Sequence, residues 1–182
     1  GTVRVCTAVA GASVTRAGSQ AYTDKNFGLT NKTVQASGVT VEDAGAADMT
    51  GNYNITYSDN TVSTITKAPL SVTAVFATKT YDGLLTAAGT GTVGTLVAGD
   101  SVTSAGSQAY TDKNFGLTNK TVQASGVTVE DAGAADMTGN YNITYTDNTV
   151  STITKAPLSV TAVFATKTYD GLLTAAGTGT VG

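Results

Sequence analysis

Histidine and tryptophan are absent from the 182-residue chain, and cysteine occurs once, as Cys6. Without histidine the chain has no Ser-His-Asp or Cys-His catalysis, no imidazole pH switch and no histidine-ligated metal. One thiol can form neither an internal disulfide nor a Cys₄ zinc site. No cluster of cations lies near Cys6 in the sequence to activate it, so we interpret it as a small apolar residue.

Positive charge is also scarce. Ten Lys and Arg stand against thirteen Asp and Glu, the net charge is −3, and the pI is near 4.7. Nucleic-acid binding needs a concentrated basic face, so we expect no nucleic-acid partner. No apolar run approaches the roughly 20 residues that span a bilayer, so we expect no membrane span in this segment. Gly1 opens no signal peptide, and we expect any export signal to lie outside this sequence.

Strong helix formers are rare as well. Leu is sparse and Glu occurs only as Glu42 and Glu130, whereas about a fifth of the chain is Thr and Val is abundant. Residues that branch at Cβ have stiff side chains that suit strands better than helices. With 41% hydrophobic residues the chain has enough apolar content to fold. The composition therefore predicts an all-β protein.

An internal repeat dominates the sequence. Residues Ala17–Gly94 recur as Ala105–Gly182, an offset of 88, and only Ser58 against Thr146 differs. Residues Gly1–Arg16 match Gly89–Ser104 at ten of sixteen positions. Because such periodicity is typical of proteins built from stacked or linked units, the repeat determines how the rest of the chain is divided.

The two prolines, Pro69 and Pro157, set the phase of the repeat. Proline is rare inside central strands and common where a strand begins, so we place a module boundary just before each one. This predicts a truncated module at 1–66 that lacks its first strand, a complete module at 67–154, and the opening strands of the next module at 155–182. The chain then resembles a window taken from a longer array.

Within the complete module, alternating apolar and polar residues are separated by Gly, Asp and Asn. They predict strands over 70–77, 92–97, 101–110, 120–129, 141–145 and 149–154. Gly126 interrupts the fourth run and indicates a bulge. The Ala-rich stretch Glu130–Met137 is the only helix candidate, and its glycines limit it to a turn or a single helical turn.

Six or seven strands at spacings of about ten residues are typical of a small β-sandwich. We therefore predict an all-β fold of tandem, small β-sandwich-like modules, Ig-like or β-grasp-like, with an 88-residue period. The expected core of the complete module comprises Val72, Phe76, Leu84, Val97, Val102, Tyr110, Val122, Val129, Tyr141, Ile143 and Ile153.

Several short motifs recur in a fixed order. They are Lys79–Gly83, Gly99-Asp100, Asp112–Gly116, Lys120–Val122, Gly139–Tyr141 and Thr152–Thr154, followed by Ala156–Leu158. Together they resemble the YDG domain, a repeat of large bacterial surface proteins similar to filamentous haemagglutinins. The resemblance implies an extracellular, adhesin-like repeat segment at the surface of a bacterium. It brings no catalytic residues. The stretch Glu130–Met137 is longer and richer in Ala than the pattern of that family.

The motif residues are interpreted as structural. Asp82 and Gly83 form a turn beside Tyr81, and Asp112 and Asn114 bond the local backbone of a loop. The full set of structural motif residues is Tyr81, Asp82, Gly83, Asp112, Asn114, Gly116, Gly139, Asn140, Tyr141, Pro69 and Pro157.

Calcium is the one metal considered, because an acidic extracellular array can be rigidified by a hard cation. Asp131, Asp136 and Asn140 offer oxygen ligands, but the EF-hand spacing is absent. A solvated loop is therefore favoured, and we predict no metal and no cofactor. An active site copied into every link of a chain is an uncommon arrangement, so we also predict that the protein is not an enzyme.

Three functions remain open. The first is a structural stalk or spacer in a bacterial adhesin or surface fibre, in which neighbouring repeats meet head to tail. The second is a fibre subunit that polymerises by strand donation, with residues 155–176 of one chain entering the incomplete first module of another. The third is a module that binds glycans or host proteins through its Tyr, Asn and Asp loops.

Overall fold

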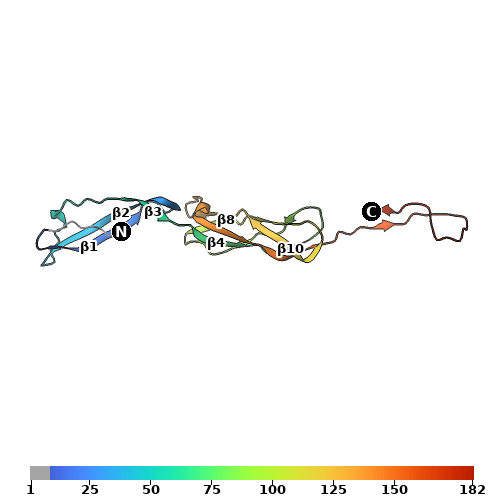
Figure 1. Cartoon of the computed structure of the whole chain (residues 1–182), viewed down its shortest axis with the longest axis horizontal. Coiled ribbons are helices and arrows are strands. Elements are labelled where there is room, and N and C mark those ends of the chain that lie inside the picture. The colour runs from blue at the N-terminus through green and yellow to red at the C-terminus, as the bar shows by residue number, and fades with distance from the viewer. Residues whose placement is uncertain (1–8) are drawn as a thin grey trace. The chain divides into compact units, whose positions relative to one another are not determined.

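The computed structural model describes residues 9–182, so Cys6 lies outside the described part. Strands form nearly all of the regular structure, with two short 3₁₀ helices, η1 (Thr50–Asn52) and η2 (Thr138–Asn140) (Figure 1). The all-β prediction is confirmed. In chain order the strands are β1 (Ala12–Tyr22), β2 (Gly28–Asp43), β3 (Asn60–Ile65), β4 (Ala68–Thr73), β5 (Thr78–Thr80), β6 (Thr86–Ala87), β7 (Thr92–Val93), β8 (Asp100–Ser104), β9 (Ser107–Tyr110), β10 (Gly116–Ser125), β11 (Thr128–Asp131), β12 (Tyr141–Thr146), β13 (Asn148–Thr154), β14 (Val160–Thr161) and β15 (Thr180–Val181).

The chain divides into two compact units. The first contains residues up to Leu70 together with Leu96–Ser101 and Val129–Ile143, and the second contains Ser71–Thr95, Val102–Thr128 and Thr144–Gly182. Strands β4, β8, β11 and β12 each have residues in both units, so the chain passes from one unit to the other within strands. These four strands belong to two small sheets, β11-β8 and β12-β4-β7.

The first unit contains the antiparallel sheet β1-β2-β3. Strand β1 pairs with β2 from Ala12 opposite Asp43 to Tyr22 opposite Val34, with an irregularity between Val14 and Arg16. The buried apolar side chains of this unit are Val41, Leu70, Val129, Met137 and Tyr141.

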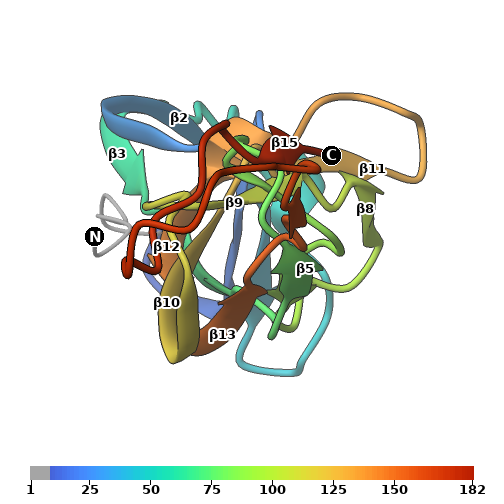
Figure 2. The ribbon, with the colours of Figure 1, turned by 90° about the vertical axis from the view of Figure 1, so that its right-hand side faces the viewer.

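The second unit is built on a five-stranded sheet in the order β5-β13-β10-β9-β6. Strands β5, β13, β10 and β9 of this sheet are labelled in Figure 2. Strand β5 runs parallel to β13, whereas β10 is antiparallel to β13 and β9. The core of this unit contains Val72, Ala74, Ala77, Tyr110, Val122, Ala124, Val127 and Ile153. Gly91 lets its chain approach this core, because a Cβ there would lie 2.8 Å from Val72 Cγ1 and 3.0 Å from Ala124 Cβ.

The predicted core is partly wrong. Val72, Tyr110, Val122, Val129, Tyr141 and Ile153 are buried as expected, and Ile143 is half-buried. Phe76, Leu84, Val97 and Val102 are instead 39–57% exposed. Strand β4 ends at Thr73, and the alternation of buried and exposed residues continues only to Ala74. Beyond it, the N–H groups of Val75 and Ala77 bond side chains of the sheet, so Ala77 faces the core and Phe76 faces solvent.

Residues that differ by 88 in number are called counterparts below. Counterparts pair in the same register in the two main sheets: Gly28, Lys32 and Val34 of β2 face Ile65, Ser63 and Asn60, just as Gly116, Lys120 and Val122 of β10 face Ile153, Ser151 and Asn148. The alanine-rich stretch before η2 forms a turn, as expected, in which Ala134 has a φ of 61°.

Candidate functional site

The loop Asp112–Gly116 is joined to the strand that follows it by an ion pair. One carboxylate oxygen of Asp112 accepts hydrogen bonds from the backbone N–H and the side-chain amide of Asn114, each 2.9 Å long. The other oxygen pairs with the Lys120 ammonium, whose residue is only 7% exposed. The Lys120 partner and these hydrogen bonds hold the pKa of Asp112 below its usual value. Asp24, Asn26 and Lys32 repeat this arrangement in the first sheet.

The side chain of Lys120 passes close to Gly116. A Cβ at this position would lie 2.7 Å from Cε of Lys120 and would also collide with the side chain of Asn119. Gly28 has the same relation to Lys32. The glycine therefore leaves room for the aliphatic stem of the lysine to pass toward its aspartate, which explains why Asp, Gly and Lys recur together in the motif.

The Tyr81-Asp82-Gly83 motif forms a closed turn. One oxygen of Asp82 accepts the N–H of Leu84 at 2.9 Å and the Lys79 ammonium at 2.8 Å, and that ammonium also donates to the Leu84 carbonyl. Gly83 has a φ of +80°, and the N–H of Tyr81 donates to the Thr154 carbonyl. The side chain of Tyr81 stays partly exposed. Lys79 lowers the pKa of Asp82 through its hydrogen bond.

Of the three calcium candidates, Asp131 ends β11, Asp136 lies in the loop that follows and Asn140 lies in η2, and at least one side-chain oxygen of each already accepts a hydrogen bond. Asp131 Oδ1 accepts the N–H groups of Gly133 and Ala135, and Asp136 Oδ1 accepts that of Thr138. Asn140 Oδ1 accepts the N–H of Phe27 at 2.8 Å. Within residues 9–182 no three acidic or cysteine side chains gather as a group that could hold a metal ion. In this structure the carboxylates hold the loop in shape.

Gly139 and Tyr141 are the other two residues of the Gly139–Tyr141 motif, on either side of Asn140. Gly139 lies in η2 with open space around it, and the buried Tyr141 begins β12. The Tyr141 hydroxyl donates to Asp100 Oδ2 at 2.6 Å and accepts the N–H of Val97, while burial raises its pKa. Pro69 is the exposed second residue of β4, and Pro157 is exposed in the segment before β14.

Two loops far apart in the sequence meet within the first unit, which the sequence did not reveal. Lys25 Nζ lies 2.6 Å from Asp131 Oδ2. Asn140 accepts the N–H of Phe27 and donates its own amide to Asn26 Oδ1 at 2.9 Å. We call these five residues the loop contact. The only sequence signal that could have found it is that each copy carries both halves, Lys-Asn-Phe and the Asp and Asn of the later loop.

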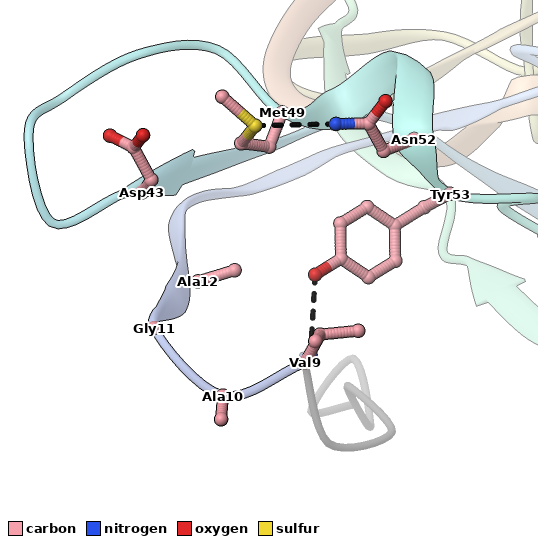
Figure 3. A pocket seen from close by; sticks show the side chains of 8 residues that line it. All are labelled: Val9, Ala10, Gly11, Ala12, Asp43, Met49, Asn52 and Tyr53. Carbon is pink, nitrogen blue, oxygen red and sulfur yellow. Dashed lines mark hydrogen bonds between the residues drawn. The ribbon is translucent and has the colours of Figure 1, made fainter.

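The counterparts of Asp131 and Asn140, which form one half of the loop contact, line an open hollow of about 300 Å³ in the first unit (Figure 3). Asp43, Met49 and Asn52 line it, and they are the counterparts of Asp131, Met137 and Asn140. The Tyr53 hydroxyl accepts the N–H of Val9 at 3.2 Å, and the Asn52 amide contacts the sulfur of Met49 (Figure 3). The hollow therefore offers the same polar groups that receive Lys25, Asn26 and Phe27 in the loop contact.

Comparison with protein families identifies a known domain in the part of the chain that carries these motifs. The YDG domain model matches residues 66–149. Residues 66–149 form a YDG domain. The YDG domain includes the turn at Tyr81, the Asp112–Lys120 ion pair, Gly139 within η2 and Tyr141 just after it. No curated protein and no solved structure matches the chain. Among the described residues, no helix is both long and apolar enough to cross a membrane.

Proposed function

We propose that the chain is a non-catalytic spacer segment of a bacterial extracellular adhesin or surface fibre, in which YDG-type repeats are linked in line as β-sandwich-like modules. The loop contact carries this proposal. It joins one surface of a repeat, Lys25 to Phe27, to a different surface of the next, Asp131 and Asn140. A contact between two different patches leaves each unit with one patch of each kind for its two neighbours, so it can be repeated along a chain of identical units.

Three further observations support a spacer. Copies that are identical at all but one of 78 positions suit a function that depends on length rather than on a unique site. The carboxylates of Asp82, Asp112 and Asp131 accept hydrogen bonds from the backbone of their own loops. The resemblance of the repeats to YDG domains of filamentous-haemagglutinin-like proteins favours location at a bacterial surface, with neighbouring repeats as the immediate partners.

Small-angle X-ray scattering on chains of different length tests the proposal. The 182-residue chain is compared with versions extended by one and by two further 88-residue repeats. A module of this size has a radius of gyration of roughly 12 Å, so the longest dimension should rise by a constant increment on the order of 30 Å per repeat. Light scattering on the same samples identifies concentrations at which each chain is monomeric. A longest dimension that does not grow with repeat number would contradict the proposal.

A further inference from the structure

Two strands that are far apart in the sequence lie side by side in the second unit. Strand β5 pairs with β13 at three positions, and the two strands run parallel (Figure 2). The N–H of Thr152 in β13 also donates to the carbonyl of Ala77, just before β5, at 3.0 Å. We call the contact of residues 77–81 with 151–154 the end-strand pairing, because β5 lies near the start of an 88-residue repeat and β13 at its end.

Hydrogen bonds close both ends of the end-strand pairing. At one end the N–H of Ala77 donates to Ser151 Oγ at 3.0 Å, and at the other the N–H of Tyr81 donates to the Thr154 carbonyl at 2.9 Å. Ala77, Ser151 and Ile153 are at most 4% exposed. Water therefore cannot reach the hydrogen bonds of Ala77 to replace them as they are stretched, so breaking them is more costly than breaking exposed ones.

The direction of the two strands decides how tension acts on them. In a chain of repeats linked in line, tension reaches this pairing from Lys67 on one side and from Lys155 on the other. It pulls β5 toward its N-terminal end and β13 toward its C-terminal end. Because the strands are parallel, these ends lie at opposite ends of the pairing, so the strands must slide and their hydrogen bonds stretch together. In an antiparallel pair the pulled ends would lie together, and the bonds would break one after another.

The segment that leads into β5 is also bonded along its length within the second unit. Strand β4 pairs with β7 at two positions. The N–H of Ala74 donates to the Thr146 carbonyl at 2.8 Å, and the N–H of Val75 donates to the buried Gln108 at 3.1 Å. Sliding of residues 72–81 must therefore break these contacts as well as the end-strand pairing.

We propose that the end-strand pairing is a mechanical clamp that keeps the second unit folded under tension applied along the chain. The proposal rests on the spacer function for the source of the tension, because a stalk is stretched when its far end is bound and pulled. Both sides of the pairing lie in the sequence that is copied without change, so every repeat supplies the same residues. A spacer whose repeats resist unfolding keeps a constant length while it is pulled.

Single-molecule pulling in two directions tests the clamp. In the full chain with Cys6→Ser, DNA handles are attached to cysteines that replace exposed residues. Lys67→Cys with Lys155→Cys makes the two strands slide, whereas Thr80→Cys with Lys155→Cys peels them apart from one end. The sliding chain also carries Thr80→Ala, so that both chains lack the contact between the hydroxyls of Thr80 and Thr154.

The two directions should give different unfolding forces. Three paired positions share the force when the strands slide, whereas they carry it in turn when the strands peel. Forced unfolding is governed by the unfolding rate, so at one pulling rate the sliding direction should need about threefold more force. The released length, about 3.3–3.6 Å for each residue between the handles, identifies the segment that unfolds. Equal forces in the two directions would overturn the clamp.

A matched pair of substitutions locates the resistance within the unit. Ser151→Ala removes the oxygen that accepts the N–H of Ala77 in the end-strand pairing. Tyr145→Phe likewise removes the acceptor of one backbone N–H, that of Val127, outside the pairing. A bond that breaks before the barrier to unfolding changes the unfolding rate, so under sliding tension Ser151→Ala should unfold about fivefold faster. Tyr145→Phe should stay within about twofold of the parent.

The outcomes separate the clamp from the spacer. Faster unfolding of Ser151→Ala alone supports the clamp, and equal effects of the two substitutions overturn it. Urea unfolding shows whether each variant is folded, and if Ser151→Ala is not, the two pulling directions decide. A chain that lengthens with repeat number but unfolds at equal forces in both directions keeps the spacer and loses the clamp. A chain that resists sliding but does not lengthen with repeat number keeps the clamp and loses the spacer.

Discussion

Buried lysines are unusual, and the neighbours of Lys32 and Lys120 explain how these two are accommodated. Lys120 is 7% exposed, yet its ammonium reaches the partly exposed Asp112 because Gly116 leaves space for the stem. A lysine can remain charged in such a position when a carboxylate accompanies it. The Asp, Gly and Lys of the motif therefore act together: the glycine leaves room for the lysine side chain, and the aspartate pairs with its ammonium.

The Asp112–Lys120 pair predicts a specific acid sensitivity. The hydrogen bond from Lys120 lowers the pKa of Asp112 in the folded chain, so its stabilisation is present above the carboxyl's unfolded pKa of about 3.9. That stabilisation is lost as the pH falls through the lower, folded pKa. Asp112→Asn should therefore be less stable than the parent at pH 6, and the difference should shrink between pH 4 and 2. Urea unfolding at a series of pH values measures this.

Asp147→Asn is the matched control for that experiment. Asp147 accepts a hydrogen bond from the uncharged amide of Gln123 at 2.9 Å and has no lysine partner among the described residues. Its replacement should leave the acid limb of the stability curve close to that of the parent. A difference between Asp112→Asn and the parent that does not depend on pH would contradict the ion-pair explanation.

Ala134 offers a second test, because a non-glycine residue with a φ of 61° is strained. The left-handed conformation costs an L-residue about 1–2 kcal/mol relative to glycine, part of which is offset by the greater freedom of glycine in the unfolded chain. Ala134→Gly should therefore raise the free energy of unfolding by up to about 1 kcal/mol. Ala132→Gly in the same loop should lower it by about 0.5 kcal/mol. Urea denaturation of both variants measures these changes in the free energy of unfolding. Destabilisation by Ala134→Gly would contradict the interpretation that Ala134 is strained.

Segments that are identical or nearly identical in sequence form different elements in the two copies; residues 12–22 differ from their counterparts only at Ala12 against Asp100 and Arg16 against Ser104. Residues 12–22 form the single strand β1, whereas their counterparts are divided into β8 and β9, and β2 is likewise longer than β10 and β11. The division falls at Gly106 and Gly126, whose φ values of 73° and 77° are in the left-handed region. A Cβ on Gly106 would also collide with the Ser125 carbonyl. The glycines permit the break, and the neighbouring strands decide whether it occurs.

Gly106→Ala tests the close approach of the backbone at Gly106. The new side chain meets both an unfavourable φ and backbone of β10, so the free energy of unfolding should fall by about 2–3 kcal/mol. Gly139→Ala is the control, because nothing lies within 4 Å of its added Cβ and its φ is not in the left-handed region. Thermal and urea unfolding of the two variants should differ clearly. Equal, small effects would show that the close approach at Gly106 is absent.

For the whole molecule, the spacer proposal is tested by how the longest dimension of a monomeric chain changes with repeat number. It depends on the two halves of the loop contact, each of which the sequence carries twice.

Much of the local structure was predictable from the sequence. The segment Tyr141–Tyr145 was expected to be a strand and forms most of β12, and 149–154 coincides with β13 apart from one residue. Asp82 with Gly83 also forms the expected turn. These features depend on side-chain branching, alternation and turn residues, which act over a few neighbouring positions.

The three-residue parallel strand β5, the exposure of Phe76 and the meeting of Lys25 with Asp131 were not predictable. Each depends on partners between 33 and 106 positions away, and no local pattern identifies them.

The sequence by itself determined that the chain is β-structured, where it turns, and that its segments are copied with an 88-residue period. Only the tertiary structure decided which copy of a segment is buried. Tyr22 and Tyr110 lie in identical local sequences, yet one is 48% exposed and the other 2%. The reason is physical: backbone preference is local, but burial requires a complementary surface. Residues 71–93 supply that surface to one sheet and not to the other.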